Sequence, residues 1–197
     1  MTLSVPREWL TLAYLDPARV LTGLRHIALT QPLDQFHYKV SSLRTRDLRK
    51  VSEGRQAAIF AYGMGQILGA PITFALSETS DYDAVVRYQE GGRVNYLPVQ
   101  LKEWVPEFLN SQTQLQDELD KLKKYVDSRD LVVAMHLNRD ATVHLSQLEF
   151  PTESIGALWF YGATDASQDR WLLIGNLLRP GALAFEFSHP PASLWSI

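Results

Sequence analysis

The 197-residue chain contains no cysteine, and this absence excludes several kinds of site at once. Without a thiol the protein cannot have a disulfide framework, a zinc site built from thiolates or a cysteine nucleophile. The chain also lacks a run of apolar residues of the length, about 18, that a membrane-spanning helix requires. Its first residues, MTLSVPREWL, lack the basic start and apolar run of a signal peptide. We therefore expect a cytoplasmic protein that does not enter a membrane.

An excess of positive charge is missing too, because 19 Lys and Arg residues are outnumbered by 22 Asp and Glu, and the net charge is -3. The field of the whole molecule would not attract nucleic acid, so any polyanion site must be a local basic patch. A solvated helix face would have the composition of such a patch as well. The best candidate is the stretch SSLRTRDLRKVSEGR, whose basic residues are Arg44, Arg46, Arg49, Lys50 and Arg55.

Several familiar catalytic motifs are absent from the sequence. The five histidines form no HExxH pair or other close ligand spacing, so a histidine zinc site is not expected. The sequence has no GxSxG elbow and no GxxxxGK[ST] loop, which argues against a serine hydrolase of that type and against a P-loop ATPase. In MHLNR, His136 and Asn138 share one face of an expected strand, where hydrogen bonding at the end of a sheet explains them as well as a functional role does.

The first third of the chain has the apolar spacing of helices. A short helix is expected over residues 6–15. Asp16-Pro17 then supplies an N-cap and a first-turn proline for a second helix, which stops before Gln31-Pro32. A third helix begins at about Ser41 or Ser52 and ends at Leu68, because a Gly-Ala-Pro turn follows. The sequence therefore opens with a helical extension over residues 1–40.

Most of the remaining chain has the pattern of strands. ITFALS, YDAVVRY and RVNYLPVQL predict three strands, the last two joined by a hairpin turn at Gly91-Gly92. LQDELDKLKKYVD has the spacing of an amphipathic helix, and DLVVAMHLN predicts a strand buried on both faces. The sequence thus predicts an α/β fold in a single domain over residues 1–197. Further strands are expected around ATVHLSQ, ALWFYGA, RWLLIGNLL and LAFEFS.

Three polar residues converge at one end of the expected hairpin. A two-residue turn at Gly91-Gly92 sets Asp83 opposite Gln100 and leaves Lys102 on the same face as Gln100. Their neighbours in both strands are apolar, so the cluster lies at the margin of a core. A bulge at Pro98 would shift this pairing by one residue. An Asp-Lys ion pair that closes the hairpin is one explanation for these residues.

Phosphodiester hydrolysis is another explanation. Carboxylate oxygens can hold a divalent ion that polarises a phosphoryl group and lowers the pKa of an attacking water. A lysine beside the ion can orient that water and stabilise the developing negative charge. Spacing alone leaves both explanations open, because one Asp with a Gln-x-Lys pair is a weak pattern.

The order of elements over residues 50–140 resembles the core of the PD-(D/E)XK, or restriction-endonuclease-like, superfamily. A helix with an acid, SEGRQAAIFAYGMGQILG, is followed by a strand, YDAVVRY, a turn, YLPVQLKE, an amphipathic helix and DLVVAMHLN. The resemblance implies a mixed central β-sheet flanked by helices. The chain then adds a helical extension over residues 1–40 and further strands and a tail over residues 141–197.

The resemblance also implies the site. Asp83 would be a ligand of Mg²⁺ or Mn²⁺ and Lys102 the catalytic lysine. Gln100 stands where the more usual member has Glu, but Gln-x-Lys variants occur in the superfamily and an amide oxygen can bind a hard cation. Glu53 stands where many members carry an additional helix Glu, and with Glu53 near the site the basic stretch would flank the metal and hold phosphates. Weaker candidates are Asp81 and Glu103 as metal ligands, and Gln114 and Lys121 as phosphate contacts.

Three hypotheses remain open from the sequence. The first is a metal-dependent nuclease that acts on DNA or RNA through Asp83, Gln100, Lys102 and Glu53. The second is a catalytically silent restriction-endonuclease-like domain that binds nucleic acid or a protein partner. The third is an unrelated α/β interaction protein in which the polar residues are structural. Endonucleases that cut both strands often pair two such sites, so a homodimer is one arrangement left open.

Overall fold

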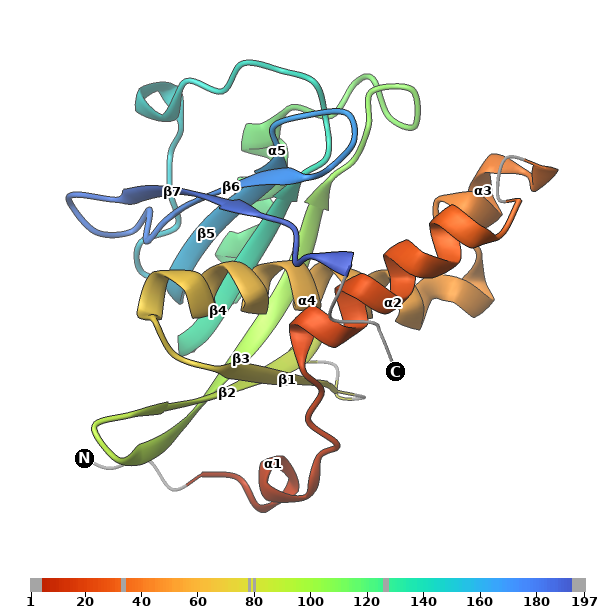
Figure 1. Ribbon diagram of the computed structural model, residues 1–197. Helices are drawn as coiled ribbons and strands as arrows, with labels where there is room; N and C mark the ends of the chain where they lie inside the picture. The colour runs from red at the N-terminus through yellow and green to blue at the C-terminus, as the bar shows by residue number, and fades with distance from the viewer. Residues whose placement is uncertain (1–4, 33–34, 78, 80, 126–127, 193–197) are drawn as a thin grey trace. The chain divides into compact units, whose positions relative to one another are not determined.

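The computed structural model describes residues 5–32, 35–77, 79, 81–125 and 128–192 (Figure 1). In these ranges the protein is mixed α/β, and seven strands form one sheet in the order β1 to β7, with parallel and antiparallel pairs. The chain divides into two compact units: unit 1 comprises Met1–Tyr96 and His189–Ile197, and unit 2 comprises Leu97–Ser188. The predicted mixed α/β class is confirmed. No helix in the described ranges is long and apolar enough to cross a membrane.

Unit 1 begins with helices. The second expected helix is confirmed, because the Asp16 carboxylate caps it by accepting from the backbone N–H groups of Ala18 at 2.8 Å and Arg19 at 3.3 Å. The first helix is shorter than predicted and ends at Thr11, since Leu15 instead forms a β-bridge with Phe74. The helices of unit 1 are α1 (Arg7–Thr11), α2 (Pro17–Thr30), α3 (Tyr38–Ser41), the 3₁₀ turn η2 (Arg46–Leu48) and α4 (Arg49–Leu68).

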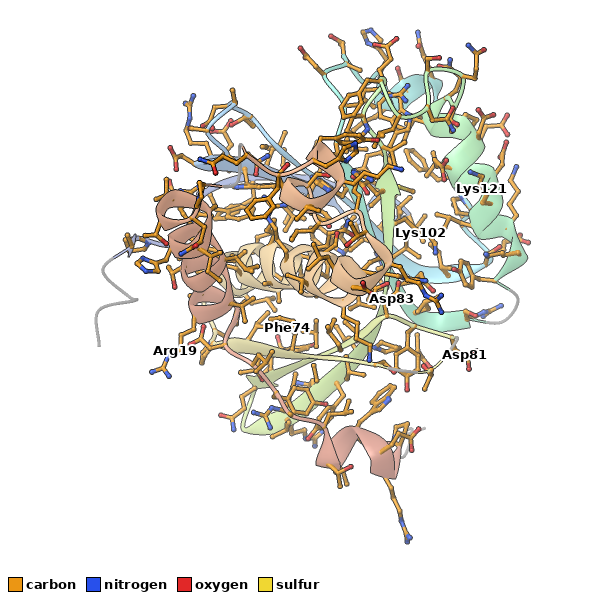
Figure 2. The ribbon with its side chains drawn as sticks, turned by 90° about the vertical axis from the view of Figure 1, so that its right-hand side faces the viewer. Arg19, Phe74, Asp81, Asp83, Lys102 and Lys121 are labelled. Carbon is orange, nitrogen blue, oxygen red and sulfur yellow. The ribbon has the colours of Figure 1, made fainter. Side chains whose placement is uncertain are left out.

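The long helix α4 organises the core of unit 1. Its middle, residues 57–61, is buried, and it packs against α2 and against β1 (Ile72–Leu76) (Figure 1). Phe74 on β1 is fully buried in this unit (Figure 2). The helix ends at Leu68, and the left-handed backbone of the following Gly69, φ 59°, allows the N–H of Ala70 to reach the Gly65 carbonyl at 3.2 Å.

A hairpin completes unit 1. Strand β2 (Ala84–Glu90) runs antiparallel to β1 and leads through Gly91 and Gly92 into β3 (Arg93–Trp104). Both turn glycines have positive φ, 56° and 77°, as a two-residue hairpin turn requires. Asp83 directly precedes β2, so the strand begins one residue after the acid that the motif predicts.

Unit 2 contains the rest of β3 and the parallel strands that follow it. β3 pairs parallel with β4 (Ser128–Leu137), which pairs parallel with β5 (Ile155–Ala163). β6 (Arg170–Gly175) and β7 (Leu183–Ser188) continue the sheet as antiparallel strands. Residues 131–136 of β4 are all buried, which confirms the prediction of a strand covered on both faces.

Two predicted elements of unit 2 differ from the structure. The amphipathic helix is split into α5 (Leu115–Asp120) and the 3₁₀ turn η3 (Lys121–Lys124), and Val126, the last apolar residue of LQDELDKLKKYVD, lies outside the described residues. The prediction of a strand around ATVHLSQ is wrong: the segment is irregular and contains the 3₁₀ turn η4 (Leu145–Gln147). A strand needs a hydrogen-bonding partner, and β4 already has β3 and β5 as its neighbours.

Candidate functional site

The four residues predicted for the site come from both units. Glu53 and Asp83 belong to unit 1, whereas Gln100 and Lys102 belong to unit 2. Each pair has a structural setting of its own, and the predicted pairing of Asp83 with Gln100 stays a prediction.

In unit 1, Arg49 connects the two acids electrostatically. Its Nε lies 2.7 Å from Oε1 of Glu53, one turn further along α4, and the Glu53 side chain is 25% exposed. This hydrogen bond raises the pKa of Arg49, the charge of Glu53 adds to the effect, and the charge of Asp83 contributes a smaller part. Glu53 and Asp83 therefore act on one guanidinium, and Arg49 offsets part of their negative charge.

The basic stretch extends from the residue pair before η2 into the first turns of α4. Arg44 precedes η2 and Arg46 lies within it, while Arg49, Lys50 and Arg55 belong to α4. Arg46, Arg49 and Lys50 are exposed, and Arg44 and Arg55 are half-buried. The five cations and Glu53 thus share one continuous segment of unit 1.

In unit 2, Gln100 and Lys102 project from the same face of β3. They lie beside Val133 and Met135 of β4, and the residue between them points to the opposite face. Gln100 is buried, with 6% of the residue exposed. Lys102, labelled in Figure 2, is half-buried. An amide and an ammonium group therefore lie at the edge of an apolar sheet face, where burial without compensation is costly.

Tyr125 is the residue that sequence reasoning missed. Its hydroxyl donates to Oε1 of Gln100 at 3.1 Å, and its ring centroid lies 5.9 Å from Nζ of Lys102. The ammonium of Lys124 lies 5.3 Å from the same ring. Tyr125 directly follows η3, so the turn that shortens the predicted helix also brings this side chain to Gln100. The one hint of this contact in the sequence is that Tyr125 follows the strand that carries Lys102.

The weaker candidates have other contacts or are exposed. Glu103 accepts a hydrogen bond from Nδ2 of Asn138 at 2.7 Å, and Asp81 is exposed. The Gln114 N–H donates to Asp117 at 2.7 Å at the start of α5. Lys121 is 59% exposed and pairs with Glu118 at 2.7 Å (Figure 2). These contacts give Gln114 and Lys121 local roles around α5.

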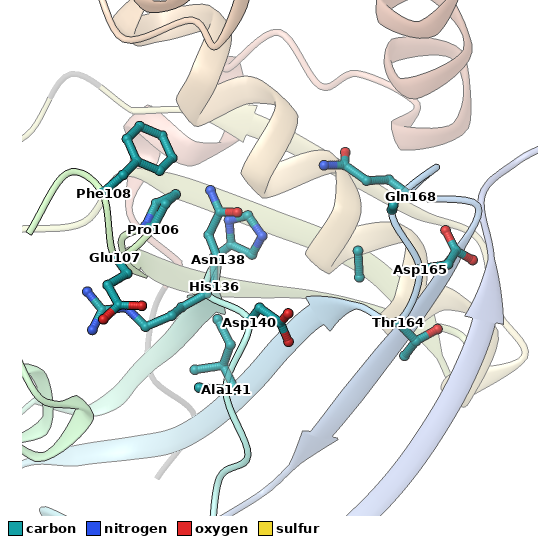
Figure 3. Close-up of a pocket in the computed structure, with 14 residues that line it drawn as sticks. Pro106, Glu107, Phe108, His136, Asn138, Asp140, Ala141, Thr164, Asp165 and Gln168 are labelled. Carbon is teal, nitrogen blue, oxygen red and sulfur yellow. The ribbon is translucent and has the colours of Figure 1, made fainter. Parts of the chain in front are cut away.

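A pocket of about 940 Å³ opens at the carboxyl ends of β3, β4 and β5 in unit 2 (Figure 3). His136, 5% exposed, lines it and stacks on the Tyr161 ring with 4.9 Å between centroids. Arg139 also lines the pocket, but its guanidinium donates to three backbone carbonyls, those of Val105, Thr113 and Asn110, and lies 4.6 Å from the Trp104 ring centroid. The arginine therefore braces the loops around the pocket.

The donor atoms of the predicted metal site suit a hard cation. Glu53 and Asp83 would offer carboxylate oxygens and Gln100 an amide oxygen, the ligand type that Mg²⁺ prefers. Gln100 Oε1 accepts a hydrogen bond from the Tyr125 hydroxyl. Among the residues described, no group of three or more His, Cys, Asp or Glu side chains is arranged to hold a metal ion. The metal site of Glu53, Asp83 and Gln100 stays a prediction.

Comparison with known proteins adds no relative to this picture. A scan against protein-family models finds no match, and searches of curated proteins and of solved structures find none either.

Proposed function

We propose that the chain is a metal-dependent nuclease that hydrolyses phosphodiester bonds in DNA or RNA. The observation that carries the proposal is the pair on β3: a buried Gln100 and a half-buried Lys102 on one face of a strand that is otherwise apolar there. Apolar residues would stabilise this position at lower cost. A chemical role for an amide oxygen and an ammonium group explains why they are present.

The order of elements supports the same proposal. α4 is followed by the antiparallel pair β1 and β2, and β3 is followed by α5 and the parallel strand β4. This is the order in which the sequence resembles the PD-(D/E)XK core. The acid-bearing helix of that resemblance is α4, which carries Glu53.

Each residue then has a role. Glu53, Asp83 and Gln100 would hold Mg²⁺ or Mn²⁺, and the ion, when bound, would polarise the phosphoryl group and lower the pKa of the attacking water. The Lys102 ammonium would orient that water and stabilise negative charge as it develops. The basic stretch would position the nucleic acid through its phosphates.

The test is cleavage of single- and double-stranded DNA and RNA with Mg²⁺ or Mn²⁺ by the wild type, Lys102→Ala and Asp83→Ala. We expect metal-dependent cutting that falls by about 10²–10³-fold in each variant, the range for removal of one transition-state contact. Lys123→Ala is the matched control, because it removes an exposed lysine of the same unit that pairs with Asp120. Cutting that survives in both site variants would overturn the proposal.

A silent domain that binds nucleic acid is the second candidate function. The observation that favours it is the bond from Tyr125 to Gln100, which satisfies the amide within the protein and needs no metal. This candidate predicts nucleic-acid binding that is unchanged by EDTA and by Lys102→Ala, with no cutting of any substrate. Binding that requires Mn²⁺ would exclude it.

A further inference from the structure

Two exposed aromatic side chains lie beside the basic stretch in unit 1. Of the Phe, Tyr and Trp residues in the described ranges, three are exposed: Phe36, Tyr38 and Phe108. Phe36 is 51% exposed and Tyr38 is 42% exposed. A single apolar side chain on a surface is common, whereas a group of them marks a surface that contacts a partner. Two rings two residues apart therefore indicate an interaction surface.

Local hydrogen bonds hold these rings and the cations that follow them in one folded segment. Tyr38 begins α3, and His37 caps this helix because its Nδ1 accepts from the Lys39 N–H at 3.3 Å. The Tyr38 carbonyl accepts from the Ser42 N–H at 2.9 Å, and the Lys39 carbonyl accepts from the Arg44 N–H at 2.6 Å. The segment is thus ordered by its own backbone, which lowers the entropy cost of binding a partner.

The charge of this segment suits a polyanion. Residues 36–50 contain five Lys and Arg residues and one acid, Asp47, in a chain whose net charge is -3. Three of these cations that are exposed are Lys39, Arg46 and Lys50. Cations that bind phosphates, combined with aromatic rings that stack on bases, are typical of surfaces for single-stranded nucleic acid. In a duplex the bases are already stacked on one another and do not reach such rings.

We propose that residues 36–50 form a binding surface for single-stranded nucleic acid. Bases stack on the rings of Phe36 and Tyr38, and the exposed cations of the segment hold the phosphates. The inference rests on the proposed action on nucleic acid and names the form of the substrate that the surface favours. Two residues of chain span at most about 7 Å, so the two rings are close enough to receive neighbouring bases. A duplex contacts the cations alone and binds more weakly.

The experiment measures the affinity of the full chain for labelled oligonucleotides by fluorescence anisotropy, in EDTA so that no metal-dependent cutting occurs. The probes are an oligothymidylate, an abasic strand of the same length and a duplex. We expect Phe36→Ala and Tyr38→Ala each to weaken oligothymidylate binding by about ten-fold, within the range for loss of one stacked base. Neither change should affect the abasic strand or the duplex, which offer the rings no base. Tyr38→Phe should bind like the wild type, because it keeps the ring.

Phe108→Ala is the control, because it removes an exposed aromatic side chain of unit 2 and should leave all three affinities unchanged. Equal losses for oligothymidylate and the abasic strand would overturn the stacking surface, and so would unchanged binding in both Ala variants. Altered self-association with unchanged oligonucleotide affinity would assign the rings to a contact with a second copy and overturn it too. Because binding is measured without metal, the expected losses in a protein that cuts no substrate would keep the surface and overturn the nuclease function alone.

Discussion

At the scale of single residues, Asp165 shows how one carboxylate holds a turn. Its Oδ1 accepts from the Asp169 N–H at 3.0 Å and from Oγ of Ser167 at 2.9 Å. Its Oδ2 accepts from the backbone N–H of Arg170 at 3.1 Å and from the guanidinium Nε at 3.2 Å. These donors, the Asp169 N–H foremost, lower the pKa of Asp165 to about 2 from an ordinary value of 3.8.

The direction of this pKa shift sets a pH dependence for the turn between β5 and β6. Because the folded pKa lies below the ordinary value, the ionised carboxylate stabilises the turn fully above pH 3.8, and the contribution is lost as the pH falls towards 2. Asp165→Asn should loosen the turn even at pH 7. Amide exchange at Asp169, followed by NMR, should accelerate in this variant. A carboxyl titration of Asp165 centred near 3.8 would contradict the prediction.

The candidate site was predictable only where its residues are close in sequence. Gln100 and Lys102 share a face because alternation along a strand is a local rule, and the structure confirms their common face. Tyr125 was not predictable, since its contact with Gln100 spans 25 residues and depends on where α5 gives way to η3. Local sequence patterns predict on which face of a strand a side chain lies. The residues that it contacts depend on turns that connect elements distant in sequence.

At the scale of elements, a glycine allows β4 and β5 to approach closely. A Cβ added at Gly156 would lie 1.9 Å from the Arg129 carbonyl oxygen, a backbone atom that cannot move aside without shifting the strand. The two strands change register in this region, between Ser128 and Val132. Gly54 in α4 differs, because its added Cβ would lie 3.7 Å from Cδ1 of Leu76, an ordinary contact.

We therefore expect the two Gly→Ala substitutions to have opposite effects. Gly156→Ala should lower the free energy of unfolding by about 1–3 kcal/mol, the range for an overpacked interior. Gly54→Ala should raise it by about 1 kcal/mol, because Ala favours a helix interior over Gly. Urea unfolding followed by circular dichroism measures both changes. Equal effects of the two substitutions would show that the close approach at Gly156 does not restrain the sheet.

Elements were predictable when their signals were local. The Asp16-Pro17 start of α2, the Gly91-Gly92 turn and the buried run of β4 each depend on a few neighbouring residues, and all three are confirmed. The strand predicted at ATVHLSQ failed, because a strand also requires a partner strand beside it, and β4, the strand that precedes this segment, has β3 and β5 on its two sides. Strand propensity alone carries no information about available partners.

At the scale of the whole molecule, the charge balance restricts how the proposed nucleic-acid substrate would bind. With a net charge of -3, the protein as a whole repels a polyanion. Salt screens this repulsion beyond a Debye length of about 8 Å at physiological ionic strength. Close to α4, the positive charge of the basic stretch therefore outweighs the net negative charge of the protein. Three of the five cations in this stretch are exposed. Binding should depend on this segment and fall steeply as salt rises.

Substituting two of these cations with neutral residues tests whether nucleic acid binds through the basic stretch. Each phosphate contact on duplex DNA contributes about 0.9 to the slope of log K against log salt concentration, so Arg46→Gln with Lys50→Gln should reduce the slope by about two. Arg19→Gln with Arg93→Gln removes the same charge from exposed positions of unit 1 outside the stretch and should leave the slope nearly unchanged. Fluorescence anisotropy with a labelled duplex measures both slopes. Because the two double variants carry the same net charge, equal losses would attribute binding to the total charge of the protein, whereas a loss confined to Arg46 and Lys50 assigns it to the segment that begins α4.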